Sequence, residues 1–247
     1  MMETDKSLSC IERLLSISNK KYNTTHREKR YLSMNIFDPD SGLMRTVSKF
    51  TDCICLSLLF FICSIPIFTI GTAATALYHT VYRVLRYDRG YVFQDYMSTF
   101  RDNFKQTTPV WLIVMAIGSV LGLDFYVLNF YAQKGIFFQI LSIIFIVGVV
   151  LLFLWISYLF PYMARFQNTR KQSMKNAILM AMVHFPMTIL ILVLAIIIGV
   201  VMYIMPFLMF ILPAIYTWIQ SFILEWIFRK YMSEEDRIAE DERNRRE

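Results

Sequence analysis

The stretch that decides the fold is residues 53–82, CICLSLLFFICSIPIFTIGTAATALYHTVY, which contains no Lys, Arg, Asp or Glu. A charged side chain is costly in the hydrocarbon of a bilayer, and one helical span takes about 20 residues, so a charge-free stretch of this length indicates membrane segments. Pro66 lacks a backbone donor and Gly71 permits unusual backbone angles, so residues 66–71 form either a kink in one helix or a turn between two. We favour the turn, which predicts helices at about 47–65 and 72–85.

Similar charge-free stretches follow along the chain. They cover residues 106–123 (continued to 133 past Asp124), 135–164 and 176–224. Because the last of them is long enough for two spans, further segments are predicted at about 107–130, 136–163, 177–202 and 206–228. The predicted fold is an all-α, polytopic helical membrane bundle of five to six segments within residues 34–230, followed by a charged cytoplasmic tail at 231–247.

The composition excludes several other classes of protein. Of the 247 residues, 56% are hydrophobic and 18% charged, against about 45–50% and about 25% in an average soluble domain. The four Cys are too few for a disulfide scaffold, and the three His have no metal-ligand spacing, so no metal site is predicted. The chain also lacks a P-loop, a G-x-S-x-G turn, a Gly-rich dinucleotide loop and an H-E-x-x-H motif. We therefore expect neither an enzyme nor a cofactor.

The basic residues predict an orientation in the membrane. Lys and Arg gather in residues 83–105, 165–175 and 229–246, whereas the connections at 131–135 and 203–206 contain only Lys134. The positive-inside rule places the basic segments in the cytoplasm, which puts both termini inside if there are six segments. With five segments the N-terminus lies outside, and long N-terminal regions can escape the rule. The tail mixes both signs of charge, so the net charge of +6 predicts no nucleic-acid partner.

Small residues mark two predicted packing faces. In the segment at 72–85, small side chains recur four positions apart, as at Gly71 and Thr75. Such a pattern lets helices approach closely, so this helix is expected to be buried among the others. Gly118 and Gly122 form a G-x-x-x-G pattern, which predicts a packing face in the next segment.

Ionisable residues inside membrane segments are candidates for function. Asp124 fits either an anchor at the outer interface or a contact to a substrate or ion. Glu225 fits a structural pair with Arg229, four residues further on. His79 and His184 fit packing roles, the second as a donor to the carbonyl that Pro186 frees one turn back. The candidate intramembrane polar residues are thus His79, Asp124, His184 and Glu225.

Residues 91–105, YVFQDYMSTFRDNFK, predict a short helix with an aromatic face at the membrane surface. This helix either lies among the lipid headgroups or, with the basic connection at 165–176, binds a cytoplasmic partner. The candidate docking residues are Phe93, Phe100, Phe104, Arg165, Arg170 and Lys171.

Four stretches of the chain, taken in order, carry a family resemblance. They are NIFDPDSGLMRTVSKFTD (35–52), SIPIFTIGTAATALYHTVYRVLR (64–86), GYVFQDYMSTFRDNFKQTT (90–108) and ARFQNTRKQSMKNAILMAMVHFP (164–186). Together they resemble the YesL-like family of small bacterial integral membrane proteins, a family of unknown function. The most specific part is the pattern that combines Pro66, Thr69 and Gly71 with the Ala76-Leu77-Tyr78 triplet.

The resemblance implies a multi-pass protein of the bacterial plasma membrane, mainly in Gram-positive species. The genes of the family often lie beside those of carbohydrate ABC importers, which implies an accessory role in sugar uptake. The family has no agreed catalytic residues, so none are transferred to this chain. Its members usually begin near the Asn35-Ile36-Phe37 stretch, so we expect Met34 to be the start and residues 1–33 to be an over-extended N-terminus.

Three functions remain open from the sequence. The first is an accessory or scaffold component whose partners are the lipid bilayer and ABC sugar importer subunits. The connection at 165–176 contains no Gly, unlike the coupling loop of an importer permease, so the chain is not expected to be the permease itself. The second is a stand-alone small-solute transporter, because interrupted helices build transport sites. The third is a membrane sensor, although the short outer loops leave little room for a ligand site.

Overall fold

The computed structural model describes residues 42–131, 136–166 and 168–232, together with residues 234, 235, 237, 238, 240 and 242. Throughout these residues all regular structure is helical. The proposed extension at 1–33 and the proposed start at Met34 lie outside the described residues. The chain divides into two compact units, Met1–Thr51 and Asp52–Glu247. In the first unit the described backbone, residues 42–51, is the beginning of helix α2 (Gly42–Ser64).

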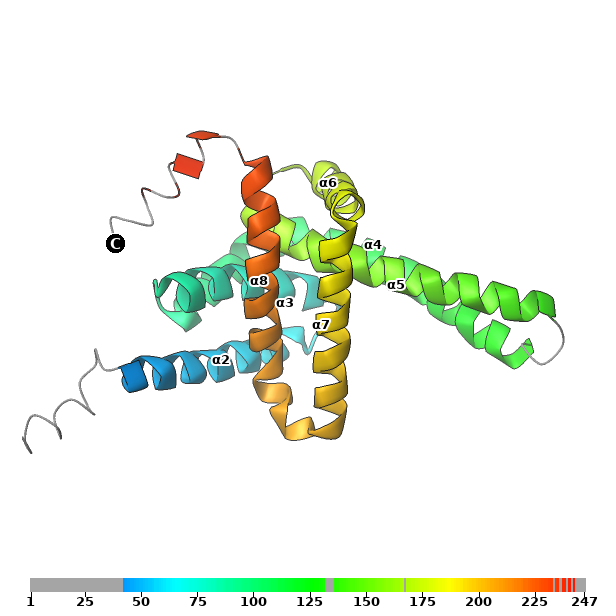
Figure 1. Cartoon of the computed structure of the whole chain (residues 1–247), viewed down its shortest axis with the longest axis horizontal. Helices are drawn as coiled ribbons and strands as arrows, with labels where there is room; N and C mark the ends of the chain where they lie inside the picture. Colours follow the sequence, from blue (N-terminus) through cyan, green and yellow to red (C-terminus); the bar gives the residue numbers. More distant parts are fainter. Residues whose placement is uncertain are drawn as a thin grey trace, which may run out of the picture. The chain divides into compact units, whose positions relative to one another are not determined.

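Seven α-helices and three short helical segments follow one another in the described part of the chain (Figure 1). In order they are α2 (Gly42–Ser64), η1 (Ile67–Thr69), α3 (Ile70–Thr80), η2 (Val81–Arg86), α4 (Val92–Tyr131), α5 (Ile136–Arg165), α6 (Arg170–Val183), α7 (Phe185–Ile204), η4 (Pro206–Phe210) and α8 (Leu212–Tyr231).

The predicted turn between two helices at Pro66–Gly71 is confirmed. Helix α2 ends at Ser64, and α3 begins at Ile70 after the short segment η1. The Thr69 hydroxyl lies 2.6 Å from the carbonyl oxygens of both Cys63 and Pro66. A hydroxyl donor at this point satisfies carbonyls that the end of α2 leaves without a helical partner.

Helix α3 is buried among its neighbours, as its small residues predict. Its buried residues are Gly71, Thr72, Ala73, Thr75, Ala76, Leu77, Tyr78 and Thr80, and the helix contacts α4, α5 and α8. A Cβ atom at Gly71 would lie 2.7 Å from Trp111 Cβ and 2.7 Å from Phe160 Cε1, so only glycine permits this approach. Helix α3 has 11 residues and continues without a break into the six-residue segment η2.

Helix α4 is one continuous helix of 40 residues, where the sequence suggested a surface helix at 91–105 and a separate span at 107–130. Pro109 lies inside this helix and has no N–H to donate to the carbonyl of Lys105. The guanidinium of Arg170 donates to that carbonyl at 2.9 Å. The helix therefore continues past the proline because a side chain from α6 replaces the missing backbone donor.

In helix α5, too, a side chain from another helix replaces the backbone donor that an internal proline lacks. Pro161 has no N–H for the carbonyl of Ser157. The buried side chain of Gln220, from α8, donates to this carbonyl at 2.8 Å. The proline thereby joins α5 to α8 through a specific hydrogen bond instead of breaking the helix.

The segment predicted at 177–202 is divided into α6 and α7, which meet at His184. Pro186 lies in the first turn of α7, where a missing N–H costs nothing. The hydroxyl of Thr188 lies 2.9 Å from the carbonyl oxygen of Ala181 and 3.0 Å from that of His184. Thr188, and not the His184 ring, supplies the donor to the carbonyls at this break.

Four of the described helices are long and apolar enough to span a membrane, namely Thr46–Ser64, Val92–Val127, Ile136–Arg165 and Phe185–Ile204. The described part of the chain is thus all-helical and has the long apolar helices of a membrane protein. Helices α4 and α5 pack side by side and expose many large apolar side chains, including Val120, Leu123, Ile136 and Ile143 (Figure 1). Such a surface requires lipid or a partner. Six segments and the N-in, C-in orientation stay predictions.

Candidate functional site

The most unusual chemistry of the molecule is a set of buried ionisable side chains, here called the Arg165 cluster. Its members are Tyr78, Tyr82, Arg165, Glu225 and Glu240. They come from α3, the π-helical segment η2, the C-terminal end of α5, the middle of α8 and the tail. Five parts of the second unit thus meet at one guanidinium group and its carboxylate and phenol partners.

Arg165 binds both carboxylates of the cluster. Its Nε lies 2.8 Å from Glu225 Oε1, and its Nη2 lies 2.9 Å from Glu225 Oε2. The same Nη2 lies 2.8 Å and 3.0 Å from the two oxygens of Glu240. The hydrogen bonds come from Nη2, whereas the Nε contact is an ion pair at short distance without a hydrogen bond. Hydrogen bonds between a guanidinium and a carboxylate are about twice as strong as those between neutral groups.

Two tyrosines complete the coordination of the carboxylates. The Tyr78 hydroxyl donates to Glu225 at 3.1 Å, and the Tyr82 hydroxyl donates to Glu240. The guanidinium carbon of Arg165 lies 4.2 Å from the centre of the Tyr82 ring, a cation–π contact. Tyr78 and Tyr82 are four residues apart, so one helical face presents both phenols to the cluster.

The cluster is closed to water. The side chain of Arg165 is 13% exposed, and those of Glu225 and Glu240 are 2% and 8% exposed. Removing charges from water is costly unless they are paired and hydrogen-bonded. Each of the three charged side chains has an ion-pair partner and at least one hydrogen bond here, although the Nε of Arg165 donates none. The arrangement suits the binding of a carboxylate or a similar oxyanion, because guanidinium and phenol donors point at one anionic group.

A basic groove lies between α4 and the connection from α5 to α6. Its volume is about 800 Å³, and it is lined by Lys105, Gln106, Asn168, Thr169, Arg170 and Lys171. Gln106 donates to the carbonyl of Asn168 at 2.8 Å, and Arg170 donates to the carbonyl of Lys105 at 2.9 Å. These two bonds fix the walls of the groove, while Lys105 and Lys171 are exposed at its surface.

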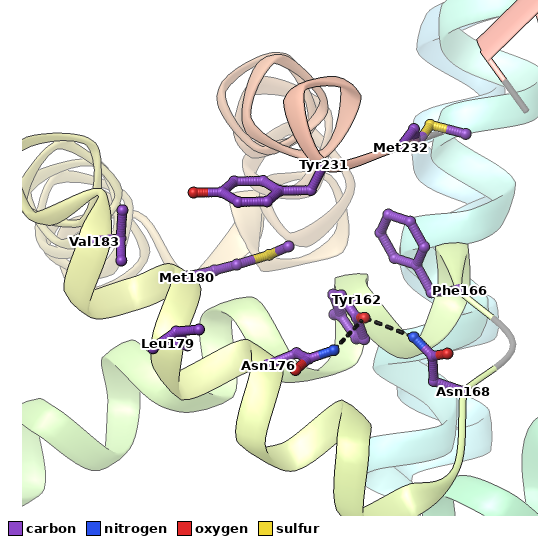
Figure 2. A pocket seen from close by; sticks show the side chains of 9 residues that line it. All are labelled: Tyr162, Phe166, Asn168, Asn176, Leu179, Met180, Val183, Tyr231 and Met232. Atoms are coloured by element: carbon purple, nitrogen blue, oxygen red, sulfur yellow. Dashed lines mark hydrogen bonds between the residues drawn. The ribbon is translucent and has the colours of Figure 1, made fainter. Parts of the chain in front are cut away.

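A second cavity, of about 340 Å³, lies between the ends of α5 and α8 and the helix α6 (Figure 2). The hydroxyl of Tyr162 accepts hydrogen bonds from the amides of Asn168 at 2.7 Å and Asn176 at 2.9 Å. Figure 2 shows both amides directed at this hydroxyl, with Leu179, Met180 and Val183 across the cavity. The cavity therefore has one polar end and a largely apolar wall.

Among the described residues, no group of three or more His, Cys, Asp and Glu side chains is placed to hold a metal ion. The chemistry of the described residues suits the recognition of anionic groups, at the Arg165 cluster and at the basic groove.

Residues 53–125 match the family described as "Protein of unknown function, DUF624". This part of the chain is similar to a domain of unknown function. No curated protein and no solved structure matches the chain. The matched segment runs from α2 into α4 and contains Tyr78 and Tyr82, whereas Arg165, Glu225 and Glu240 lie beyond it.

The candidate docking residues are divided between surface and interior. Phe93 is 59% exposed near the start of α4. Phe100 and Phe104 are half-buried, and Phe100 stacks on the buried ring of Tyr96 at 6.5 Å and packs against the core. Arg170 and Lys171 line the basic groove, but Arg165 lies in the cluster that bears its name.

The candidate intramembrane residues also fall into different environments. His79 is partly buried, and its Nδ1 lies 3.0 Å from the hydroxyl of Thr99. Asp124, near the far end of the DUF624 segment, is half-buried between the exposed side chains of Leu123 and Phe125. His184 packs edge-on against the ring of Tyr231.

Glu225 is the only one of these four candidates that joins the Arg165 cluster, and its ion pair there is with Arg165, sixty positions away in the sequence.

The predicted packing face at Gly118 and Gly122 has more distant neighbours than Gly71 has. A Cβ atom at Gly118 would lie 3.7 Å from Leu152 Cδ2, and one at Gly122 would meet nothing within 4 Å.

Sequence reasoning missed the roles of Tyr82, Gln220 and Glu240. The spacing of Tyr78, Tyr82 and Arg86 at four-residue intervals was a usable signal for one polar helical face. Internal prolines in α4 and α5 were a second signal, because each one demands a donor from elsewhere. Nothing in the charged tail distinguishes Glu240 from its acidic neighbours before the chain is folded.

Proposed function

We propose that this chain is a non-catalytic accessory subunit of a membrane assembly. It holds its partner through the basic groove and the exposed start of α4. The observation that carries the proposal is the groove itself, whose walls are fixed by two inter-segment hydrogen bonds while its lysines stay exposed. A rigid surface with free positive charge suits recognition of an acidic partner surface.

The proposal includes the YesL-like family for the chain and a carbohydrate ABC importer for the assembly. The resemblance in residues 64–86 and 90–108 falls inside the segment that matches the domain of unknown function. The family context then supports a bacterial plasma-membrane location and importer subunits as partners. In this arrangement the groove, α6 and the tail lie on the cytoplasmic side, in keeping with their basic residues.

The experiment is co-purification at native expression level. The chain carries a C-terminal tag, the membrane is dissolved in mild detergent, and retained proteins are identified by mass spectrometry. We expect importer permease or ATPase subunits with the wild-type chain. The Lys105→Glu, Lys171→Glu double variant reverses two exposed charges of the groove and is expected to lose these subunits.

The matched control is Lys175→Glu, a charge reversal at an exposed lysine of the same helix α6, outside the groove. It is expected to retain the partners. Retention of the importer subunits by the double variant would overturn the groove as the docking surface. A wild-type chain that purifies without importer subunits would overturn the accessory role itself.

A further inference from the structure

Glu240 is buried although it belongs to the charged tail that follows α8, whose described residues 234, 235, 237, 238, 240 and 242 are helical. Its relative exposure is 6%, whereas the other described tail residues, Glu234, Glu235, Arg237, Ile238 and Glu242, are exposed. A glutamate is almost never fully buried unless it is paired. The partners that bind the Glu240 carboxylate are the guanidinium of Arg165 and the hydroxyl of Tyr82.

Glu240 adds a second carboxylate to the one that Arg165 already contacts. With Glu240 bound, the Arg165 guanidinium contacts both Glu225 and Glu240. Without Glu240, Arg165 keeps its contacts to Glu225, and its Nη2 loses the contacts at 2.8 Å and 3.0 Å to the two oxygens of Glu240. Arg86 lies beside the cluster, where its guanidinium donates to the carbonyl of Ser221 at 3.1 Å and approaches the ring of Phe222 at 4.7 Å.

The donors that hold Glu240 would remain in place without it. Arg165 is fixed by its two contacts to Glu225, at 2.8 Å and 2.9 Å. Tyr82 is buried and belongs to η2, which is continuous with the buried helix α3. A guanidinium and a phenol held in position by other contacts form a preorganised site for one carboxylate, and preorganisation reduces the cost of binding.

We propose that Arg165 and Tyr82 form a carboxylate-binding site that the chain's own Glu240 occupies reversibly. When the tail leaves, the site binds a glutamate or aspartate of an acidic segment from a partner protein. Glu240 of the tail thus competes with the carboxylate of the partner for the same binding site. The proposal rests on the geometry of the cluster and does not depend on the groove as a docking surface.

The test uses the full-length protein in detergent micelles and a fluorescently labelled synthetic peptide with the sequence of residues 233–247. In the wild-type protein the site is filled by the attached tail. In Glu240→Gln the attached tail loses its carboxylate, so the peptide should bind about tenfold more tightly than to the wild type, as measured by anisotropy. The matched control is Glu234→Gln, at an exposed glutamate of the same tail, which should behave as the wild type.

Three further measurements make the result specific. A peptide that itself carries Glu240→Gln should fail to bind the Glu240→Gln protein. Hydrogen exchange of residues 233–247 should be faster in Glu240→Gln than in Glu234→Gln. If Glu240→Gln does not fold, a chain that ends at Met232 takes its place in the binding assay.

The proposal fails if the peptide binds the wild type and Glu240→Gln equally, or if loss of its glutamate leaves binding unchanged. Vesicles of anionic phospholipid provide a separate arm. If they displace the peptide from the Glu240→Gln protein and neutral vesicles do not, the site binds a lipid phosphate, and the protein segment as its partner is refuted.

Discussion

Replacement of Arg165 by leucine is the sharpest test of the Arg165 cluster as a source of stability. The change removes the one guanidinium that contacts both Glu225 and Glu240, whose side chains are 2% and 8% exposed. Breaking a buried ion pair by deleting one partner costs about 3–5 kcal/mol, because the remaining charge is buried without compensation. For a chain of this length a loss of that size lowers the melting temperature by about 6–20 °C.

The assay is unfolding of the purified protein in detergent, followed by the fluorescence of its four Trp residues. The matched control is Arg83→Leu, which removes an arginine from a more exposed pair. The side chain of Arg83 is 45% exposed and lies 3.1 Å from Asp95, whose side chain is 14% exposed. Because one partner of this pair is partly in water, the pair should contribute less than the buried Arg165 pairs, and the control should lose less stability than Arg165→Leu.

A rescue variant separates charge burial from the loss of packing. Glu225→Gln and Glu240→Gln, combined with Arg165→Leu, remove all three charges together. Replacing a buried ion pair by neutral groups of similar volume is often close to neutral, so the triple variant should recover most of the lost stability. If Arg165→Leu unfolds within about 1 kcal/mol of Arg83→Leu, the reasoning about uncompensated buried charge is refuted.

Three further predictions concern single positions. Gly71→Ala should destabilise the fold by about 1–3 kcal/mol, because its Cβ meets Trp111 and Phe160 at 2.7 Å; Gly122→Ala, with nothing within 4 Å, should be neutral or stabilising in the same melting assay. Gln220→Leu should cost about 1–3 kcal/mol in denaturant unfolding by leaving the Ser157 carbonyl without its donor. Asp124→Asn should change stability by less than about 0.5 kcal/mol, and sugar uptake by the protein alone in liposomes should equal that of empty liposomes for both forms; uptake abolished by this substitution would favour a transporter.

The features that sequence could predict are those that depend on local chemistry. A charge-free run with Pro66 and Gly71 in its middle allowed either one kinked helix or two helices with a turn between them, and the distribution of basic residues favoured the turn, which the structure has. The density of small residues after Gly71 was likewise sufficient to predict a buried helix. In each case the physical constraint acts within a few residues of its cause, so no knowledge of distant contacts is needed.

Helix boundaries at prolines could not be predicted in the same way. Pro109, Pro161 and Pro186 look alike in the sequence, yet helices continue through the first two and a new helix begins at the third. Continuation depends on whether a distant side chain replaces the missing N–H, and Arg170 and Gln220 do so. The donor and the proline are about sixty residues apart, so their relationship exists only in the folded chain.

Arg165 shows why the sequence alone predicted the wrong environment for a charged residue. The sequence places it among the candidate docking residues, whereas the structure places it in a buried cluster. Arg165 ends a long apolar helix and begins a basic connection, which is typical of a solvated, partner-facing arginine. Its actual surroundings are set by Glu225 from α8 and Glu240 from the tail, neither of which is near it in sequence. Both carboxylates converge on one guanidinium, and Glu240 also accepts a hydrogen bond from Tyr82, so the described part of the tail is joined to α5 and η2 through the Glu240 carboxylate. Under the proposed exchange of Glu240, the occupancy of this site connects the position of the tail to the packing of α3, α5 and α8.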